Sequence, residues 1–195
     1  QPDSPLTQKP TEDTTDPTVL TLADADNGFQ NLGRCSLLWE VQHRWPGGAR
    51  FAYNIYPHEC RLMLQGPIGT ASSIISSCEG VMQGCVWGMI LYGIGLLPLA
   101  EDLRRHDPSI LQPWYADDFA LEGPATSVAQ LFQRLCQRGP DVGYFPAPAK
   151  SYVVCPRASE PAAKAAFDAA DLPVQFSRGQ RYVGGFVGST SKRDR

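Results

Sequence analysis

The chain has 195 residues, of which 43% are hydrophobic and 19% charged, so it can bury one ordinary core and most of it should fold. Its net charge of −3 argues by itself against a strong nucleic-acid binder. No apolar run is long enough for a membrane span, because the most apolar stretch, 81–100, contains Gln83, four glycines and Pro98. We therefore expect no membrane partner.

The chain begins with a polar segment, 1–17, which is rich in Pro, Thr, Asp and Gln and is predicted to be disordered or a linker remnant. The β-prone run TVLTLA, 18–23, predicts a strand that ends abruptly at Asp24. Apolar residues at helical spacing then predict an amphipathic helix over 31–45, which the sequence Pro46-Gly47-Gly48 should stop.

A second apolar segment, 51–64, leads to a Gly-Pro turn, and weak alternation over 72–77 indicates a strand. A glycine-containing loop, 79–84, precedes a long helical pattern over 86–105. Two short apolar runs, 110–115 and 119–121, then flank a pair of aspartates. This pattern predicts a β-hairpin with the carboxylates at its tip.

The remaining chain predicts, in order, a helix, a strand, an alanine-rich helix and a last strand: 126–138, 151–155, 161–170 and 181–187. Helices and strands interleave, and the hairpin is antiparallel. The predicted fold class is therefore α+β, with helices packed on one face of a small antiparallel sheet. The folded domain should cover 18–188 and be followed by a basic, flexible tail, 189–195.

Charge is distributed unevenly between the two ends of the chain. Before Arg34, one basic residue (Lys9) accompanies six acids, whereas from Arg178 onward five basic residues accompany one acid. An acidic patch that binds cations and a basic tail that contacts phosphate would give this pattern. Two solvated ends of an ordinary protein would give it equally well.

The six cysteines show neither a CxxC pair nor zinc-ligand spacing, which indicates free thiols in a reducing compartment. The expected location is therefore intracellular, in the cytoplasm or the nucleus. No basic-then-apolar leader is visible, so no signal peptide is expected. Because the first residue is glutamine instead of methionine, we expect the chain to be a piece of a longer protein.

Asp117 and Asp118 are adjacent in the segment PWYADDFALEG, where apolar residues flank them. Two carboxylates so close together repel unless a cation lies between them, and Mg²⁺ with oxygen ligands would resolve the conflict. The alternative is a plain Asp-Asp turn. A third carboxylate, Asp24, ends a predicted strand and could complete a cage for two metal ions about 3.5–4 Å apart. Asp26 is the weaker competitor for that position.

The stretch Tyr115-Ala116-Asp117-Asp118 resembles the YxDD box of reverse transcriptases, and four other segments resemble further boxes of that family in the family's order. They are 24–29 (an Asp followed five residues later by an aromatic), 80–85 (a Gln-Gly pair before a helix), 143–151 (a Gly, then a Lys before a strand) and 181–185 (the primer-grip hairpin). The nearest subgroup is the non-LTR retrotransposon type, and the region resembles a polymerase palm.

The resemblance implies an RNA-directed DNA polymerase that adds deoxynucleotides to a primer 3′-hydroxyl on an RNA or DNA template. Asp24, Asp117 and Asp118 would bind two Mg²⁺ ions, or Mn²⁺ in their place, with Asp118 the least directly bound. Lys150 would lie near the leaving pyrophosphate as a cation and general acid. Its alternative is a solvated loop lysine.

The resemblance also implies a nucleotide site. Phe29 would stack under the incoming sugar, Gln83 and Gly84 would lie along nucleotide and template, and Tyr115 would pack near the primer end. Their alternatives are an ordinary core phenylalanine, a helix-start turn and a half-buried strand aromatic. The implied primer-grip residues are Tyr182, Gly184 and Gly185.

The sequence departs from the family in three places. The family usually has a Pro after Gln-Gly-x, whereas the run here is Cys85-Val86-Trp87, whose bulky side chains could crowd the template. A basic fingers segment and a full thumb are missing from the sequence. Two alternatives therefore stay open beside an active but incomplete polymerase: a non-catalytic, domesticated binding module and an unrelated Mg²⁺-dependent phosphotransfer domain.

Overall fold

The computed structural model describes residues 16–56, 59–67 and 72–189. The described chain forms two compact units. The first unit contains 16–24, 106–134 and 147–189, and the second contains 25–105 and 135–146. The predicted domain, 18–188, contains all but the first two and the last of these described residues, and its limits stay a prediction.

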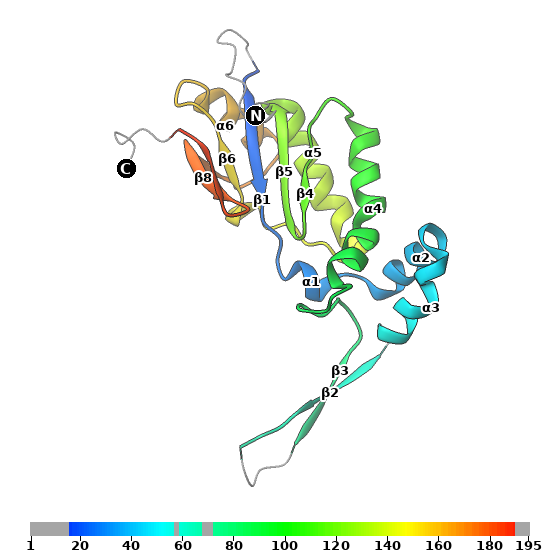
Figure 1. Ribbon diagram of the computed structural model, residues 1–195. Helices are drawn as coiled ribbons and strands as arrows, with labels where there is room; N and C mark the ends of the chain where they lie inside the picture. Colours follow the sequence, from blue (N-terminus) through cyan, green and yellow to red (C-terminus); the bar gives the residue numbers. More distant parts are fainter. Residues whose placement is uncertain (1–15, 57–58, 68–71, 190–195) are drawn as a thin grey trace. The chain divides into compact units, whose positions relative to one another are not determined.

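The first unit contains a five-stranded sheet, in which only the last pair of strands is parallel (Figure 1). Its strands, in spatial order, are β4 (Trp114–Tyr115), β5 (Asp118–Pro124), β1 (Thr18–Ala23), β6 (Tyr152–Val154) and β7 (Gln175–Ser177). The central strand β1 pairs with β5 on one side and β6 on the other, so two antiparallel neighbours set its register. The α+β prediction is confirmed.

Strand alternation divides the sheet into two faces. Val19, Thr21 and Ala23 of β1 are buried on one face. Figure 1 shows α5 (Ala125–Arg138) and α6 (Glu160–Ala169) on one side of the sheet. Phe167 of α6 packs edge-on against Phe176 of β7, with ring centroids 6.0 Å apart. Helices therefore cover one face of the sheet, as predicted.

The other face carries a smaller cluster around Leu22, Ala120 and Val154. Tyr182 and Val187 of a two-stranded hairpin, β8 (Gly179–Tyr182) with β9 (Gly185–Gly188), pack against that cluster. The sequence predicted one strand over 181–187. Instead the chain turns at Val183-Gly184, both of which have positive φ, so the segment folds back on itself.

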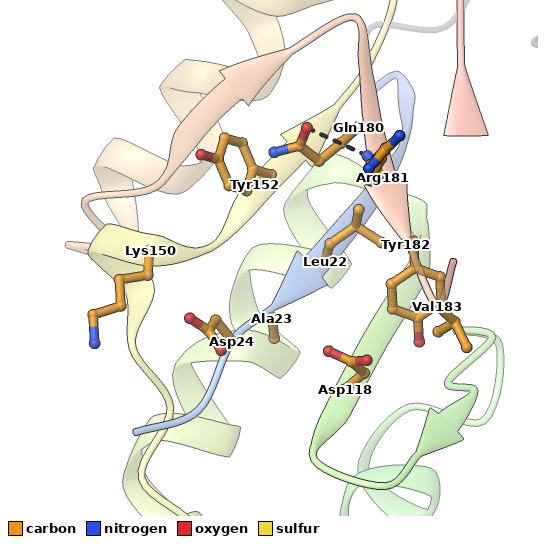
Figure 2. Close-up of a pocket in the computed structure, with 10 residues that line it drawn as sticks. All are labelled: Leu22, Ala23, Asp24, Asp118, Lys150, Tyr152, Gln180, Arg181, Tyr182 and Val183. Atoms are coloured by element: carbon orange, nitrogen blue, oxygen red, sulfur yellow. Dashed lines mark hydrogen bonds between the residues drawn. The ribbon is translucent and has the colours of Figure 1, made fainter. Parts of the chain in front are cut away.

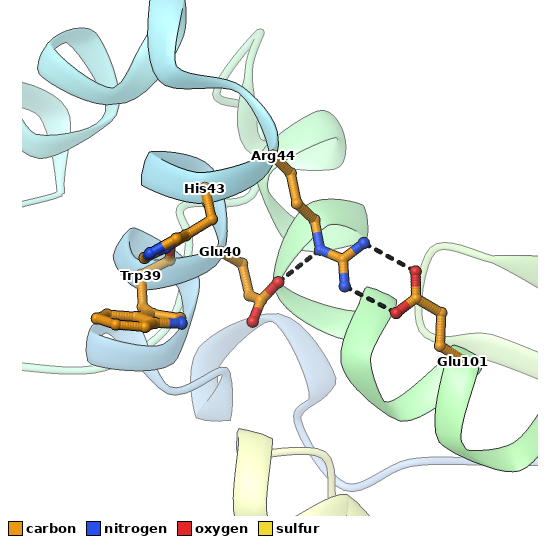
Figure 3. Close-up of polar contacts among 5 residues, drawn as sticks. All are labelled: Trp39, Glu40, His43, Arg44 and Glu101. Atoms are coloured by element: carbon orange, nitrogen blue, oxygen red, sulfur yellow. Dashed lines mark hydrogen bonds and ion pairs between the residues drawn. The ribbon is translucent and has the colours of Figure 1, made fainter.

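The second unit is mainly helical and also carries a two-stranded hairpin. Its helices are α1 (Gly28–Asn31), α2 (Arg34–Arg44), α3 (Pro46–Ile55) and α4 (Gly88–His106), and its strands are β2 (Cys60–Leu64) and β3 (Ser73–Ser77). Figure 3 shows Arg44 of α2 bound to Glu40 one turn earlier and bidentately to Glu101 of α4. These exposed ion pairs link α2 to α4, as a surface contact of modest energy.

Six predicted elements are present within about two residues of their expected ends: 18–23, 72–77, 86–105, 126–138, 151–155 and 161–170. The helix expected over 31–45 begins at Arg34, and the run 110–115 forms a strand only over its last two residues. In the second unit, the predicted end of the helix before Pro46 is confirmed, and one other expectation was wrong. Pro46-Gly47-Gly48 ends α2, but Pro46 also begins α3, because the fixed φ of proline suits the first turn of a helix. The apolar segment 51–64 is not one element, since it contains the end of α3 and the strand β2.

Two terminal predictions fall almost wholly outside the described residues. Of the segment 1–17, only Asp16 and Pro17 are described, and both accept hydrogen bonds from the first backbone N–H groups of α5. Of the tail 189–195, only Ser189 is described. No described helix has the length and apolarity that a bilayer crossing requires. All six cysteines are free thiols.

Candidate active site

The two adjacent aspartates lie at the predicted hairpin. Tyr115 of β4 pairs with Asp118 of β5, which leaves Ala116 and Asp117 as a two-residue turn. Ala116 has φ 57°, the positive value that tight hairpin turns need at their first central position. Asp117 is therefore a turn residue, whereas Asp118 begins a strand, which determines the sheet face to which its side chain belongs.

Asp24 lies opposite Asp118. The pairing of β1 with β5 ends at Ala23 and Phe119, so the next residue of β1 and the preceding residue of β5 face each other. Both carboxylates belong to the sheet face of Leu22 and Ala120, because side chains two residues apart share a face. Directly opposed residues of antiparallel strands have Cβ atoms about 4.5–5.5 Å apart.

Lys150 reaches the same place through a backbone network. The Asp24 N–H donates to Ser151 Oγ at 3.1 Å, and the Ser151 hydroxyl donates to the Ala147 carbonyl at 2.9 Å. The Ala147 N–H in turn donates to the Asp24 carbonyl at 2.8 Å. These bonds hold the short 3₁₀ turn Pro148–Lys150 beside the end of β1.

A pocket of about 200 Å³ opens at this point (Figure 2). Ten residues from β1, β5, the 3₁₀ turn, β6 and the β8–β9 hairpin line it: Leu22, Ala23, Asp24, Asp118, Lys150, Tyr152, Gln180, Arg181, Tyr182 and Val183. Figure 2 shows the carboxylates of Asp24 and Asp118 at the ends of neighbouring strands, with Tyr182 beside Asp118. Two acids and two cations therefore share one small pocket.

The electrostatics of the pocket reflect this crowding. Partial burial, then the nearby charges of Asp117 and Asp24, raise the pKa of Asp118 above its ordinary value. Burial and the Asp118 charge raise the pKa of Tyr182 to about 12, so its hydroxyl stays protonated. That hydroxyl is buried and has no hydrogen-bond partner among the described residues. A protonated donor thus lies close to a carboxylate that a cation would stabilise.

The donor set fits a hard divalent cation in chemistry, because carboxylate oxygens are the ligands that Mg²⁺ prefers. Across the residues that the structure describes, no group of three His, Cys, Asp or Glu side chains is arranged to hold a metal ion. The predicted cage of Asp24, Asp117 and Asp118 therefore stays a prediction. Asp118 lines the pocket, whereas Asp117 is not among its lining residues. The expected order in which the two bind a metal ion stays a prediction.

The other predicted residues of the first unit are placed as follows. Tyr115 shares the face of Asp118 and is 58% exposed, so it is not the half-buried aromatic of the alternative interpretation. Gly184 lies in the turn of the β8–β9 hairpin and Gly185 begins β9. Tyr182 is the primer-grip candidate that reaches the pocket.

The remaining predicted residues lie in the second unit. Phe29 is 9% exposed, and its ring stacks on Tyr92 at 4.4 Å, so it has the packing role of a core phenylalanine. Gln83 and Gly84 are exposed in the loop that precedes α4. Asp26, the competitor of Asp24, also lies in this unit. The contacts of Phe29, Gln83 and Gly84 with a nucleotide stay predictions.

Sequence reasoning missed four residues of the site: Ser151, Tyr152, Gln180 and Arg181. Two signals were available. Tyr152 follows Lys150 by two positions into a strand, and Arg181 directly precedes Tyr182 in the hairpin. Ser151 could not be found in this way, because its role depends on a hydrogen bond to Asp24, far away in the sequence.

No protein-family model matches this chain, and no curated protein matches it in sequence. Solved structures do match it in fold. A telomerase from Candida tropicalis, in its apo form and truncated from the C-terminal domain, superposes with a TM-score of 0.56 over 88% of this chain at 11% identity. A telomerase from Candida albicans, in complex with a fragment of telomeric RNA, gives 0.52 over 89% at 12% identity.

The chain has a reverse-transcriptase-like fold. At this level of identity the likeness concerns the fold alone. The chain spans about a third of the length of the two telomerases, 34% and 30%.

Proposed function

We propose that the chain is the palm of an RNA-directed DNA polymerase of the non-LTR retrotransposon type, which adds deoxynucleotides to a primer 3′-hydroxyl. One observation carries the proposal: Asp24 and Asp118 face each other across β1 and β5, at a pocket that Lys150 also lines. Strand-terminal carboxylates beside a cation, in a reverse-transcriptase-like fold, suit nucleotidyl transfer.

Asp24 and Asp118 would hold Mg²⁺, or Mn²⁺, with Asp117 as the third ligand from the adjacent turn. Such ions, when bound, lower the pKa of the attacking hydroxyl and stabilise charge on the transferred phosphoryl group. Lys150 would neutralise charge on the leaving pyrophosphate and supply a proton. The Tyr182 hydroxyl would donate a hydrogen bond within the pocket. Arg181 would attract a phosphate of the primer strand.

The proposed partners are deoxynucleotides and an RNA or DNA template with its primer. One of the telomerases of similar fold was solved with RNA, which supports an RNA partner. Segments outside this chain, equivalent to fingers and thumb, would supply most of the grip on the nucleic acid. The palm by itself is net acidic, and phosphate neutralisation supplies most nucleic-acid affinity.

Primer extension on an RNA template with Mg²⁺ tests the proposal. Asp24→Asn and Asp118→Asn should each lower kcat by about 1,000-fold, because metal-assisted charge stabilisation is worth several kcal/mol. Asp26→Asn is the matched control, since Asp26 is an exposed carboxylate two positions after Asp24 in the sequence and does not line the pocket; the rate of this variant should change by less than about twofold.

Equal background incorporation by the unsubstituted chain and all three variants would contradict the polymerase activity of this chain. RNA binding that survives in that case would support the domesticated binding module. Phosphate-ester hydrolysis that depends on Asp118, without primer extension, would support the unrelated phosphotransfer domain.

A further inference from the structure

Arg34 is a buried arginine at the start of α2, only 3% exposed. Its side chain binds the last residue of β3 and the segment that follows this strand. Nε donates to the Gly80 carbonyl at 2.8 Å, one terminal nitrogen donates to the Ser77 carbonyl at 2.7 Å, and the other donates to Ser77 Oγ at 3.0 Å. The Arg34 backbone N–H also donates to Glu79 at 2.8 Å. One residue therefore makes four bonds to three neighbours in that segment.

Tyr56 binds the same segment a few residues later. It is fully buried, and its hydroxyl oxygen accepts a bond from the Met82 N–H at 3.1 Å. Burial raises the pKa of Tyr56 to about 12, and a hydrogen bond between its hydroxyl and the Cys85 thiol adds to that shift. The Arg34 guanidinium lies 5.7 Å from the centre of the Tyr56 ring, so the two residues also contact each other.

Backbone bonds from the first helical segment complete this network. The Gly80 N–H donates to the Leu32 carbonyl and the Val81 N–H donates to the Phe29 carbonyl, both at 2.8 Å. The segment from Ser77 to Met82 is thus bonded at nearly every residue. The next two residues, Gln83 and Gly84, are exposed, as is Met82 before them.

A buried charge is costly, and burying an arginine without a function is unfavourable compared with an apolar side chain. The guanidinium fork is rigid and planar, so it fixes the geometry of the carbonyls that it binds. Here one carbonyl belongs to Ser77, the last residue of β3, and the other to Gly80 in the irregular loop that follows. The buried guanidinium of Arg34 therefore serves to fix the conformation of this loop.

We propose that Arg34 and Tyr56 are positioning residues that hold the loop Ser77–Gly88 in one conformation and thereby present Gln83 and Gly84 to template and nucleotide. The second part of this proposal, that the loop contacts template and nucleotide, rests on the proposed polymerase function. Its first part, that the two side chains set the loop conformation, does not depend on that function.

The network also accounts for the departure Cys85-Val86-Trp87. Cys85 donates its N–H to the Met82 carbonyl at 3.2 Å and bonds Tyr56 through its thiol. The Trp87 ring packs against Trp45 and Phe51, with centroids 5.9 and 5.3 Å away. Two of the three unusual side chains are therefore committed to packing, and only Val86 is widely exposed, at 86%.

Amide hydrogen exchange on the whole chain tests the positioning role. Tyr56→Phe keeps the buried ring and removes the acceptor of the Met82 N–H, so exchange at Met82 should accelerate about five- to tenfold, the effect of one lost hydrogen bond. Arg34→Lys should accelerate exchange at Gly80 and Val81 by at least as much, because lysine cannot reproduce the fork. Far-ultraviolet circular dichroism should match the unsubstituted chain.

Two exposed residues of α3 provide matched controls. Tyr53→Phe and Arg50→Lys make the same chemical changes on the surface and should leave exchange in Ser77–Gly88 unchanged. Unchanged loop exchange in both Tyr56→Phe and Arg34→Lys would overturn the proposal. If Arg34→Lys fails to fold, the Tyr56→Phe result decides.

Steady-state primer extension separates this role from the active site itself. Tyr56→Phe should raise KM for the deoxynucleotide about fivefold and change kcat by less than about twofold, because it loosens a binding loop by one hydrogen bond. Asp118→Asn should lower kcat and leave loop exchange unchanged. Faster amide exchange in the loop with an unchanged KM would contradict the proposal that the loop presents Gln83 and Gly84 to the nucleotide. A chain that never extends primers but shows the exchange pattern would contradict the polymerase function alone.

Discussion

Ser151 shows how a residue without a proposed catalytic role can position two residues of the site. It is fully buried and uses its one hydroxyl twice, as acceptor from Asp24 and donor to Ala147. A hydroxyl can do both because it carries one proton and two lone pairs. Asp24 and Lys150 therefore reach the same pocket through a residue that is not itself among the lining residues.

Ser151→Ala should lower the free energy of unfolding by about 1 kcal/mol, because the partly buried Asp24 N–H loses its acceptor. It should also lower kcat/KM for primer extension, since the turn that carries Lys150 loses a tether. Urea unfolding measures the first effect. Ser73→Ala, at an exposed strand position, is the control and should lie within about 0.5 kcal/mol of the unsubstituted chain.

Turns and caps decide where the helices and strands of this chain meet. The two-residue turn at Ala116-Asp117 places Asp118 opposite Asp24, and the turn at Val183-Gly184 brings Tyr182 over the sheet. A tight turn of this kind also ends the 3₁₀ segment Gly139–Val142, at Gly143. These turns therefore determine which residues of the joined elements lie next to each other.

Gly143→Ala should destabilise the chain by about 3 kcal/mol or more, combining a left-handed backbone with a steric clash. Gly143 has φ 81°, and an added Cβ would lie 2.0 Å from the Asn31 carbonyl oxygen. Gly184 is the matched control because it has φ 77° and nothing within 4 Å of an added Cβ. Gly184→Ala should cost only about 1 kcal/mol, the strain of φ alone. Equal losses in thermal unfolding would contradict the role of the Asn31 contact.

Over the whole molecule, a net charge of −3 coexists with a basic C-terminal end and with Arg181 and Lys150 at the pocket. Affinity for nucleic acid depends on the number of phosphates that cations neutralise. Because such a chain has few cations to neutralise phosphates, its binding to nucleic acid should be weak and should depend only shallowly on salt concentration.

The chain should bind single-stranded RNA with Kd of about 10 μM or weaker at 150 mM salt, as expected for non-specific binding by few cations. Replacing Lys192, Arg193 and Arg195 with glutamine should reduce the slope of log K against log salt by up to about 2, at roughly 0.7 per charge. Fluorescence anisotropy between 50 and 300 mM salt measures this. Nanomolar binding, or an unchanged slope, would contradict it.

Local patterns predicted much of this protein. Alternation and helical spacing identified the strand 18–23, the helices over 31–45 and 126–138, and the aspartate hairpin, because each depends on neighbours within a few residues. The order of the motifs indicated a reverse-transcriptase-like fold, which the solved structures share. The strand β7 was missed because its three residues carry no periodicity.

Contacts between residues far apart in the sequence determined the arrangement of the candidate site. The sequence named Asp24, Asp117 and Asp118 together, but only the register of β1 against β5 assigns Asp118, not Asp117, to the position opposite Asp24. Likewise, Ser151, Tyr182 and Arg34 act through partners far away in the chain. Residue type and spacing encode local conformation. They do not encode which distant backbone groups meet, because that depends on the packing of the whole core.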